Sequence, residues 1–142
     1  MKPSNILISK IKEFESLKLK AYKDSVGIPT IGWGHTLGVK MGMVITEEQA
    51  EKFIMEDLQP RVNYVNSINK PFTQGQFDAL VDFSYNLGVD ALMHSTLLKR
   101  ILEDAPYSEI KKQFLRWVYA DGKVLNGLVK RRNWEAKRFI ET

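Results

Sequence analysis

The sequence predicts an α+β fold in which a small N-terminal β-hairpin lobe lies beside a larger all-helical lobe, with a cleft between the two. Three features predict this: apolar residues at helical spacing before residue 15, an alternating, glycine-rich stretch over about 17–45, and two capping boxes beyond it. The chain has 142 residues, 44% of them hydrophobic, which suits one domain over residues 1–142. In that domain the β lobe covers about 17–45, and the helical lobe covers about 46–142 together with the N-terminal helix.

The first segment is predicted to be a helix. Leu7, Ile11 and Phe14 fall on one helix face, and they follow Ser4, a residue type that caps helices. Glu15 ends this helix. Its carboxyl group therefore lies at the negative end of the helix dipole, which disfavours ionisation and helps to keep the side chain protonated.

The next segment is predicted to be a β-hairpin. Apolar and polar residues alternate over 17–22, which indicates a strand, and the run stops at a turn-forming stretch, 24–27. Residues 28–36 mix β-branched and aromatic side chains with glycines, which is typical of a returning strand and a tight bend.

Helices are predicted for the rest of the chain. The stretches 46–49 and 73–76 each have the spacing of a capping box, and the second opens an apolar-periodic run that ends at Gly88, a residue type that stops helices. Other helices are expected after Ser95, after Pro106 or Ser108, and after Gly127, with a turn at Asp121-Gly122 before the last of them.

Composition excludes several classes of protein. With no cysteine, the chain has no disulfide, no thiolate nucleophile and no cysteine-based zinc site. The N-terminus lacks the uninterrupted apolar core of a signal peptide, and no stretch approaches the length of a membrane span, so we expect cytoplasmic synthesis and no stable membrane insertion. A net charge of +4 favours an anionic partner, but it does not choose between nucleic acid, a membrane surface and a cell wall.

Glu15, Asp24 and Thr30 are the candidate catalytic residues. Hydrolysis of a glycosidic bond needs a protonated acid and a second carboxylate that activates water or attacks the sugar. Five residues separate Asp24 from Thr30, and in a hairpin this spacing can place the two side chains opposite each other, with one water between them. Taken alone, the spacing does not distinguish these residues from solvated surface charges.

The surrounding sequence resembles that of the phage-type lysozymes. Their pattern of Glu, eight residues, Asp, five residues and Thr is present at Glu15, Asp24 and Thr30. The matching blocks cover nearly the whole chain: 14–15, 19–24, Gly27, 30–36, 78–88, 95–98 and 122–132. This resemblance implies a lysozyme-like fold and an endolysin that cuts the β-1,4 bond between N-acetylmuramic acid and N-acetylglucosamine in peptidoglycan, so that the host cell lyses.

The resemblance also implies roles for individual residues. Glu15 is expected to be the general acid, with Asp24 and Thr30 positioning the attacking water; this suggests inversion at the sugar carbon, and retention stays open. Of the pair Arg131 and Arg132, we expect Arg131 to reach Glu15 across the cleft.

Four other residues are further candidates for the site. His35 is a candidate base, although a histidine that holds a loop is more common. Asn86 and Gly88 either border the substrate groove or serve only the helix end. Trp33 is the tryptophan best placed to stack on a sugar.

Three further positions are a rival acid and two departures from the family pattern. Glu13 is a rival acid, but an offset of two residues turns it away from Glu15 on a helix, so we expect it to be solvated. Ser16 stands where the family often has glycine, and Asn126 stands where it often has proline. We expect these two departures to tune rate or stability and not to abolish activity.

The competing functions are weaker. A zinc amidase needs about three protein ligands drawn mainly from histidine and cysteine, and the chain offers only His35 and His94. A nucleic-acid-binding module, or a lysozyme-like fold that binds sugar without cutting it, has no use for the Glu–Asp–Thr trio. We therefore expect peptidoglycan as the partner, no nucleic acid, no metal and no cofactor. The protein is expected to be a monomer that waits in the host cytoplasm for a holin-type membrane permeabiliser.

Overall fold

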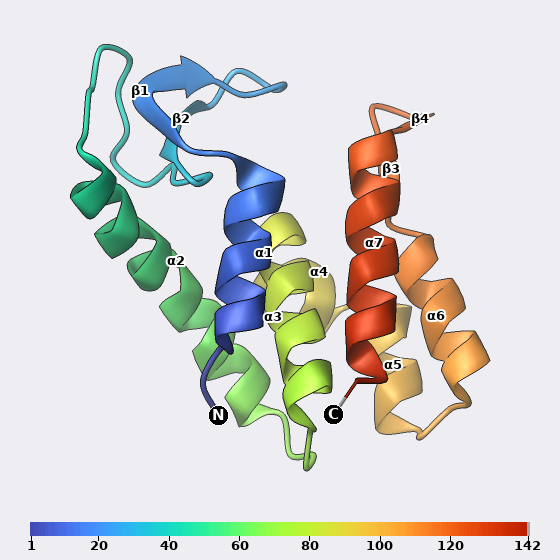
Figure 1. The fold of residues 1–142 in the computed structure, drawn as a ribbon. Helices are drawn as coiled ribbons and strands as arrows, with labels where there is room; N and C mark the ends of the chain where they lie inside the picture. The colour runs from blue at the N-terminus through green and yellow to red at the C-terminus, as the bar shows by residue number, and fades with distance from the viewer. Residues whose placement is uncertain (142) are drawn as a thin grey trace.

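The computed structural model describes residues 1–141 and has two lobes (Figure 1). The elements in chain order are α1 (Asn5–Glu15), β1 (Lys18–Lys23), β2 (Pro29–Gly32), α2 (Glu47–Ser67), α3 (Gln74–Leu87), α4 (Val89–Met93), α5 (Thr96–Leu102), α6 (Tyr107–Leu115), β3 (Tyr119–Ala120), β4 (Lys123–Val124) and α7 (Asn126–Phe139). The β1–β2 hairpin lies above the upper end of α1, and the N-terminus and the last turn of α7 lie at the opposite end of the molecule (Figure 1). The predicted α+β class is confirmed.

The register of the first hairpin differs from the prediction. Strands β1 and β2 are antiparallel, and Thr30 lies opposite Tyr22, not opposite Asp24. The backbone N–H of Asp24 donates to the carbonyl of Ile28, and that of Gly27 donates back to the carbonyl of Asp24, at 3.0 Å each. These bonds make 24–28 a closed turn. Asp24 therefore belongs to the turn, and the expectation that it faces Thr30 across paired strands is wrong.

Side-chain caps start the helices where the sequence predicts them. The hydroxyl of Ser4 accepts a hydrogen bond from the N–H of Leu7, and both predicted capping boxes, at Thr46 and Thr73, are present. Each cap satisfies an N–H group that has no partner inside the helix. Helix α6 begins directly after Pro106, α7 begins one residue before Gly127, and the short helix α4 was not predicted.

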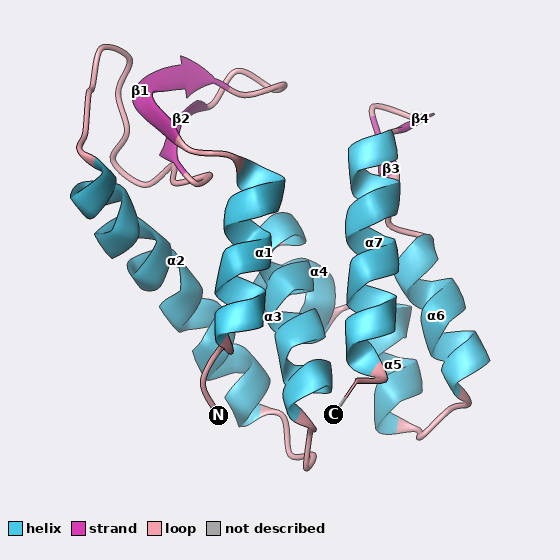
Figure 2. Cartoon of the chain, in the orientation of Figure 1, coloured by secondary structure: helices cyan, strands magenta, loops and turns pink. Residues whose placement is uncertain are grey.

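The helical lobe also contains strands, which corrects the expectation that it is all-helical. Strands β3 and β4 form a small hairpin at the upper end of α7 (Figure 2). Its turn consists of Asp121 and Gly122, which both have positive φ, at 51° and 76°. Asp-Gly is a favoured pair for a two-residue turn of this hand, because each residue tolerates a left-handed backbone. The predicted turn is present, and it connects strands instead of helices.

Helix α3 lies at the centre of the helical lobe and carries residues of the candidate site. It packs against α7 and α2, and its side chains are buried from Phe77 to Ser84. At Gly75, α3 approaches the end of α7 so closely that a side-chain carbon would overlap the carbonyl oxygens of Arg138 and Glu141. Two ion pairs join α3 to α7, one at Asp78 and one at Asp82. Within residues 1–141, no helix is long and apolar enough to cross a membrane.

Candidate active site

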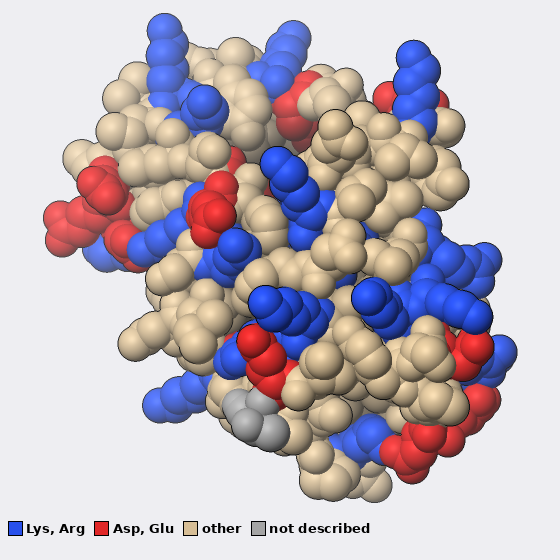
Figure 3. Space-filling view, turned by 45° about the vertical axis from the view of Figure 1, so that its right-hand side comes forward, with Lys and Arg blue, Asp and Glu red and all other residues tan. Residues whose placement is uncertain are grey.

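An open groove of about 650 Å³ lies beside Glu15. It is bordered by the end of α1, the turn after β1, the end of α3 and the start of α7. Its lining residues are Glu13, Phe14, Glu15, Ser25, Asn86, Leu125, Gly127, Leu128, Lys130 and Arg131. In the space-filling view, Lys and Arg side chains are spread over the visible face and do not gather in one patch (Figure 3).

Glu15 occupies the last position of α1, with 21% of its side chain exposed. Nη1 of Arg131 donates to Oε2 of Glu15 at 2.5 Å. Two electrostatic effects therefore act on this carboxyl group in opposite directions. The end of the helix disfavours the negative charge, and the guanidinium favours it.

Ser16 ends α1 with a backbone that usually belongs to glycine. Its φ is 60°, and its N–H donates to the carbonyl of Lys12 at 3.0 Å. A side chain in this left-handed region costs about 1–2 kcal/mol relative to glycine. We therefore expect the departure from the family pattern at this position to lower stability, while the backbone after Glu15 keeps a conformation that glycine favours.

Gly34 holds the other side of the Glu15 carboxyl group. Its φ is +87°, and a Cβ built on it would lie 2.8 Å from Oε1 of Glu15. Only a residue without a side chain brings the backbone this close to the carboxyl group. The bend at 32–36 thus fixes the position of Glu15 from the β lobe, while Arg131 fixes it from α7.

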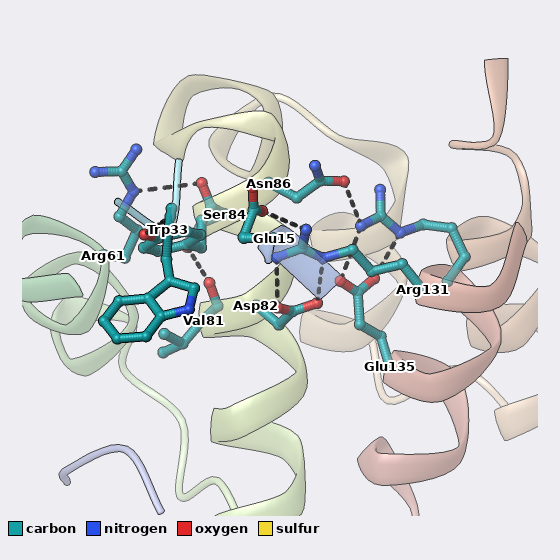
Figure 4. Close-up of polar contacts among 11 residues, drawn as sticks. Glu15, Trp33, Arg61, Val81, Asp82, Ser84, Asn86, Arg131 and Glu135 are labelled. Atoms are coloured by element: carbon teal, nitrogen blue, oxygen red, sulfur yellow. Dashed lines mark hydrogen bonds and ion pairs between the residues drawn. The ribbon is translucent and has the colours of Figure 1, made fainter. Parts of the chain in front are cut away.

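Arg131 is held in turn by Asp82. Its Nε donates to Oδ2 of Asp82 at 3.0 Å and its Nη2 donates to Oδ1 at 2.8 Å (Figure 4). Both side chains are at most 5% exposed. Burial opposes the charge of Arg131, but the carboxylates of Asp82 and Glu15 outweigh it and raise its pKa above the usual range. Arg131 is therefore a fixed cation between two carboxyl groups.

Asn86 is held by a second buried arginine. Nη2 of Arg132 donates to Oδ1 of Asn86 at 2.7 Å and to Oε2 of Glu135 at 2.9 Å. Nε of Arg132 lies 2.7 Å from the other oxygen of Glu135, but the angle does not allow a hydrogen bond. Because its amide oxygen is taken by Arg132, Asn86 can offer its NH₂ group to the groove.

Asp24 and Thr30 are both bonded to the peptide units of Ile28. Oδ1 of Asp24 accepts from the N–H groups of Val26 and Ile28, at 3.0 and 2.8 Å, and the hydroxyl of Thr30 donates to the carbonyl of Ile28 at 2.8 Å. Among the described residues no hydrogen bond engages Oδ2 of Asp24. This oxygen and the lone pairs of the Thr30 hydroxyl can both accept from a water.

His35 lies apart from the groove. It is 4% exposed, its Nδ1 lies 2.9 Å from Oδ2 of Asp57 on α2, and its ring stacks on Phe53 with centroids 4.0 Å apart. Burial raises the pKa of Asp57, and the contact with His35 opposes this shift. His35 and Asp57 line a separate cavity of about 240 Å³, so these contacts agree with the loop-holding interpretation.

Two other sequence candidates lie elsewhere. Gly88 ends α3 with a φ of 96° and does not line the groove as the structure describes it. Trp33 is 5% exposed, with Nζ of Lys12 at 4.5 Å from its ring centroid, so it packs in the core and does not offer a face to a sugar. Glu13 is solvated as expected, with 68% of its side chain exposed.

Sequence reasoning missed Asp82 and Glu135, and it gave Arg132 no role of its own. A signal was available, because Asp78 and Asp82 are one turn apart within a strongly apolar helix, and Arg131 and Arg138 are two turns apart on α7. Opposite charges that each lie on one face of their own helix predict buried pairs where the two helices pack. No group of three His, Cys, Asp or Glu side chains within residues 1–141 is arranged to hold a metal ion.

Comparisons with known proteins agree on one family. The family model "Phage lysozyme" matches residues 12–135. The endolysin of Bacillus phage B103 is 45% identical over 140 residues, and this chain spans about half of that relative (52%). The endolysin of Acyrthosiphon pisum secondary endosymbiont phage 1 is 42% identical, with 91% of both chains covered. The solved endolysin from Escherichia coli O157:H7 phage FAHEc1 superimposes with a TM-score of 0.87 at 41% identity, covering 99% of this chain and 94% of that one.

Proposed function

The chain belongs to the phage lysozyme family, whose enzymes hydrolyse bacterial peptidoglycan and lyse the host cell, and from this premise we propose that Glu15 is its general acid. The bond cut is the β-1,4 linkage between N-acetylmuramic acid and N-acetylglucosamine. The observation that carries the assignment is the placement of Glu15, a partly exposed carboxyl group fixed between Gly34 and Arg131 at the side of a groove. A fixed acid beside the leaving oxygen is what the first step requires.

Asp24 and Thr30 position the attacking water in this proposal. The support is the fixed turn, in which Oδ1 of Asp24 and the Thr30 hydroxyl are both bonded to the peptide groups of Ile28. The remaining acceptors of the two side chains can orient a water and take part of the charge that develops on it. In this arrangement water attacks the sugar directly, and the product has inverted configuration.

The proposal is tested on purified peptidoglycan. We expect the protein to reduce the turbidity of the suspension and to release fragments with N-acetylmuramic acid at the new reducing end, in the inverted configuration when the fresh product is followed by proton NMR. New reducing ends on N-acetylglucosamine would assign the cut to the other glycosidic bond, and new amino groups would assign it to a peptide or amide bond. Binding of the wall without release of fragments would leave a sugar-binding protein.

We also propose that the protein acts as a monomer and reaches the wall from the host cytoplasm through a holin-type membrane permeabiliser. The support is its similarity to endolysins, one of which it matches over 91% of both chains. Bacteria that express the chain are expected to lyse only after a membrane-permeabilising agent is added. Lysis without the agent would show that the protein reaches the wall by itself.

A further inference from the structure

We propose that Asp82 is a positioning residue for the reaction: through Arg131 it balances the charge beside Glu15, so that Glu15 can hold its proton. This inference rests on the proposed role of Glu15 as the general acid. Asp82 does not touch the groove. Its influence on the reaction passes through one guanidinium group, which bonds to Asp82 on one edge and to Glu15 at the other.

The geometry makes Arg131 a rigid connection. Two parallel hydrogen bonds to Asp82 fix the plane of the guanidinium, and the remaining nitrogen, Nη1, is directed at Oε2 of Glu15 (Figure 4). The ring of Phe14 lies 5.0 Å from the centre of the guanidinium. Such bidentate pairs are among the strongest hydrogen bonds in proteins, and burial protects this one from competing water.

The charges of Arg131 and Asp82 explain why Arg131 needs a carboxylate partner. An unbalanced guanidinium 2.5 Å from Glu15 would strongly favour the carboxylate, and a general acid must carry a proton. The carboxylate of Asp82, bonded to the same guanidinium, opposes this effect. Arg131 then fixes the position of Glu15 without supplying a full unopposed positive charge to it.

A second buried carboxyl group, Glu135, does not take over this task. Burial, together with the neighbouring Asp82, raises the pKa of Glu135 well above its usual value, and the arginine that Glu135 contacts is Arg132, not Arg131. Burial acts in the same direction on Asp82, but Arg131, a hydrogen bond with Glu135 and the charge of Arg132 together lower the pKa of Asp82. Of the two buried carboxyl groups, Asp82 is therefore the one that carries the compensating charge.

Other charged and titratable groups also act on Glu15. Tyr22 on β1 and Tyr85 on α3 lie within its electrostatic reach, and both have raised pKa values, chiefly because of burial. Asp24 also acts on Tyr22. Glu13 and Lys130 line the same groove, and the charge of Arg132 acts on Asp82. The substitutions below leave all of these groups in place, so a change in the pH profile reports on Asp82.

The test is the pH profile of kcat/KM for Asp82→Asn, which keeps the shape of the side chain and removes its charge. Glu15 should then lose its proton more easily, so the alkaline limb of the profile shifts to lower pH by about one unit. On that limb, activity at a given pH falls about tenfold.

Asp78→Asn is the matched control. Asp78 lies one turn earlier on α3, is equally buried, and accepts two hydrogen bonds from Arg138 on α7, at 3.1 and 2.8 Å. Both variants remove the charged partner of a buried arginine that joins α3 to α7, so both should lose stability. Only Asp82→Asn should move the limb. Equal limbs in the two variants, with both folded by circular dichroism at the assay temperature, would overturn the proposal.

Glu135→Gln keeps the proposal testable even if Asp82→Asn does not fold. Because Glu135 contacts Arg132 and not Arg131, and burial disfavours its charge, this variant should leave the alkaline limb where it is. A shift of about one unit in Glu135→Gln would show that Glu135 carries the compensating charge, and the proposal would fail. Failure of the proposed function is a different result, since the unmodified protein would then not cut peptidoglycan at any pH.

Discussion

Replacement of Glu15 by glutamine should lower kcat/KM on peptidoglycan by about a thousandfold or more, while the protein stays folded. Glutamine has the shape of the acid but cannot transfer a proton to the leaving oxygen. It can still accept a hydrogen bond from Arg131 through its amide oxygen, and Arg131 keeps both of its bonds to Asp82. The measurements are the rate of turbidity loss and the thermal unfolding temperature.

Glu13→Gln is the control for this prediction. Glu13 lines the same groove and undergoes the same chemical change, but its side chain is 68% exposed and its ion pair is with Lys10 on the same helix. We expect its activity to stay within about threefold of the unmodified protein, because an exposed ion pair contributes little. An inactive Glu13→Gln together with an active Glu15→Gln would show that the general acid is Glu13 and not Glu15.

Replacement of Gly34 by alanine should lower kcat/KM by about a hundredfold, because a small displacement of a catalytic group costs activity of this order. The new methyl group would lie 2.8 Å from Oε1 of Glu15. That oxygen is at the end of a flexible side chain, so the carboxyl group moves and the backbone does not. The variant should therefore bind peptidoglycan and turn it over slowly.

Gly38→Ala separates displacement of the acid from strain of the backbone. Gly38 also has a positive φ, +72°, but a Cβ on it would meet no atom within 4 Å. Both alanine variants should lose about 1–2 kcal/mol of stability from the left-handed backbone. Only Gly34→Ala should lose most of its activity. Equal activities in the two variants would mean that the position of Glu15 does not depend on this contact.

The local features of the fold could be predicted from the sequence. Ser4, Thr46 and Thr73 cap helices through atoms three residues away, and Asp121-Gly122 forms a turn within its own hairpin. Such interactions depend on short stretches of chain, whose patterns are visible in the sequence. The hairpin of the helical lobe was missed because strands of two residues carry no measurable alternation.

The Glu–Asp–Thr spacing and its neighbouring blocks determined the family, and with it the candidate acid. The tertiary structure decided what surrounds that acid. Arg131 is 116 positions away from Glu15 and 49 from Asp82, and the three meet because α1, α3 and α7 pack together. The close approach of Gly34 and the burial of Asp82 depend on the same packing. Contacts at such separations depend on how whole elements pack, and no local pattern of residues encodes them.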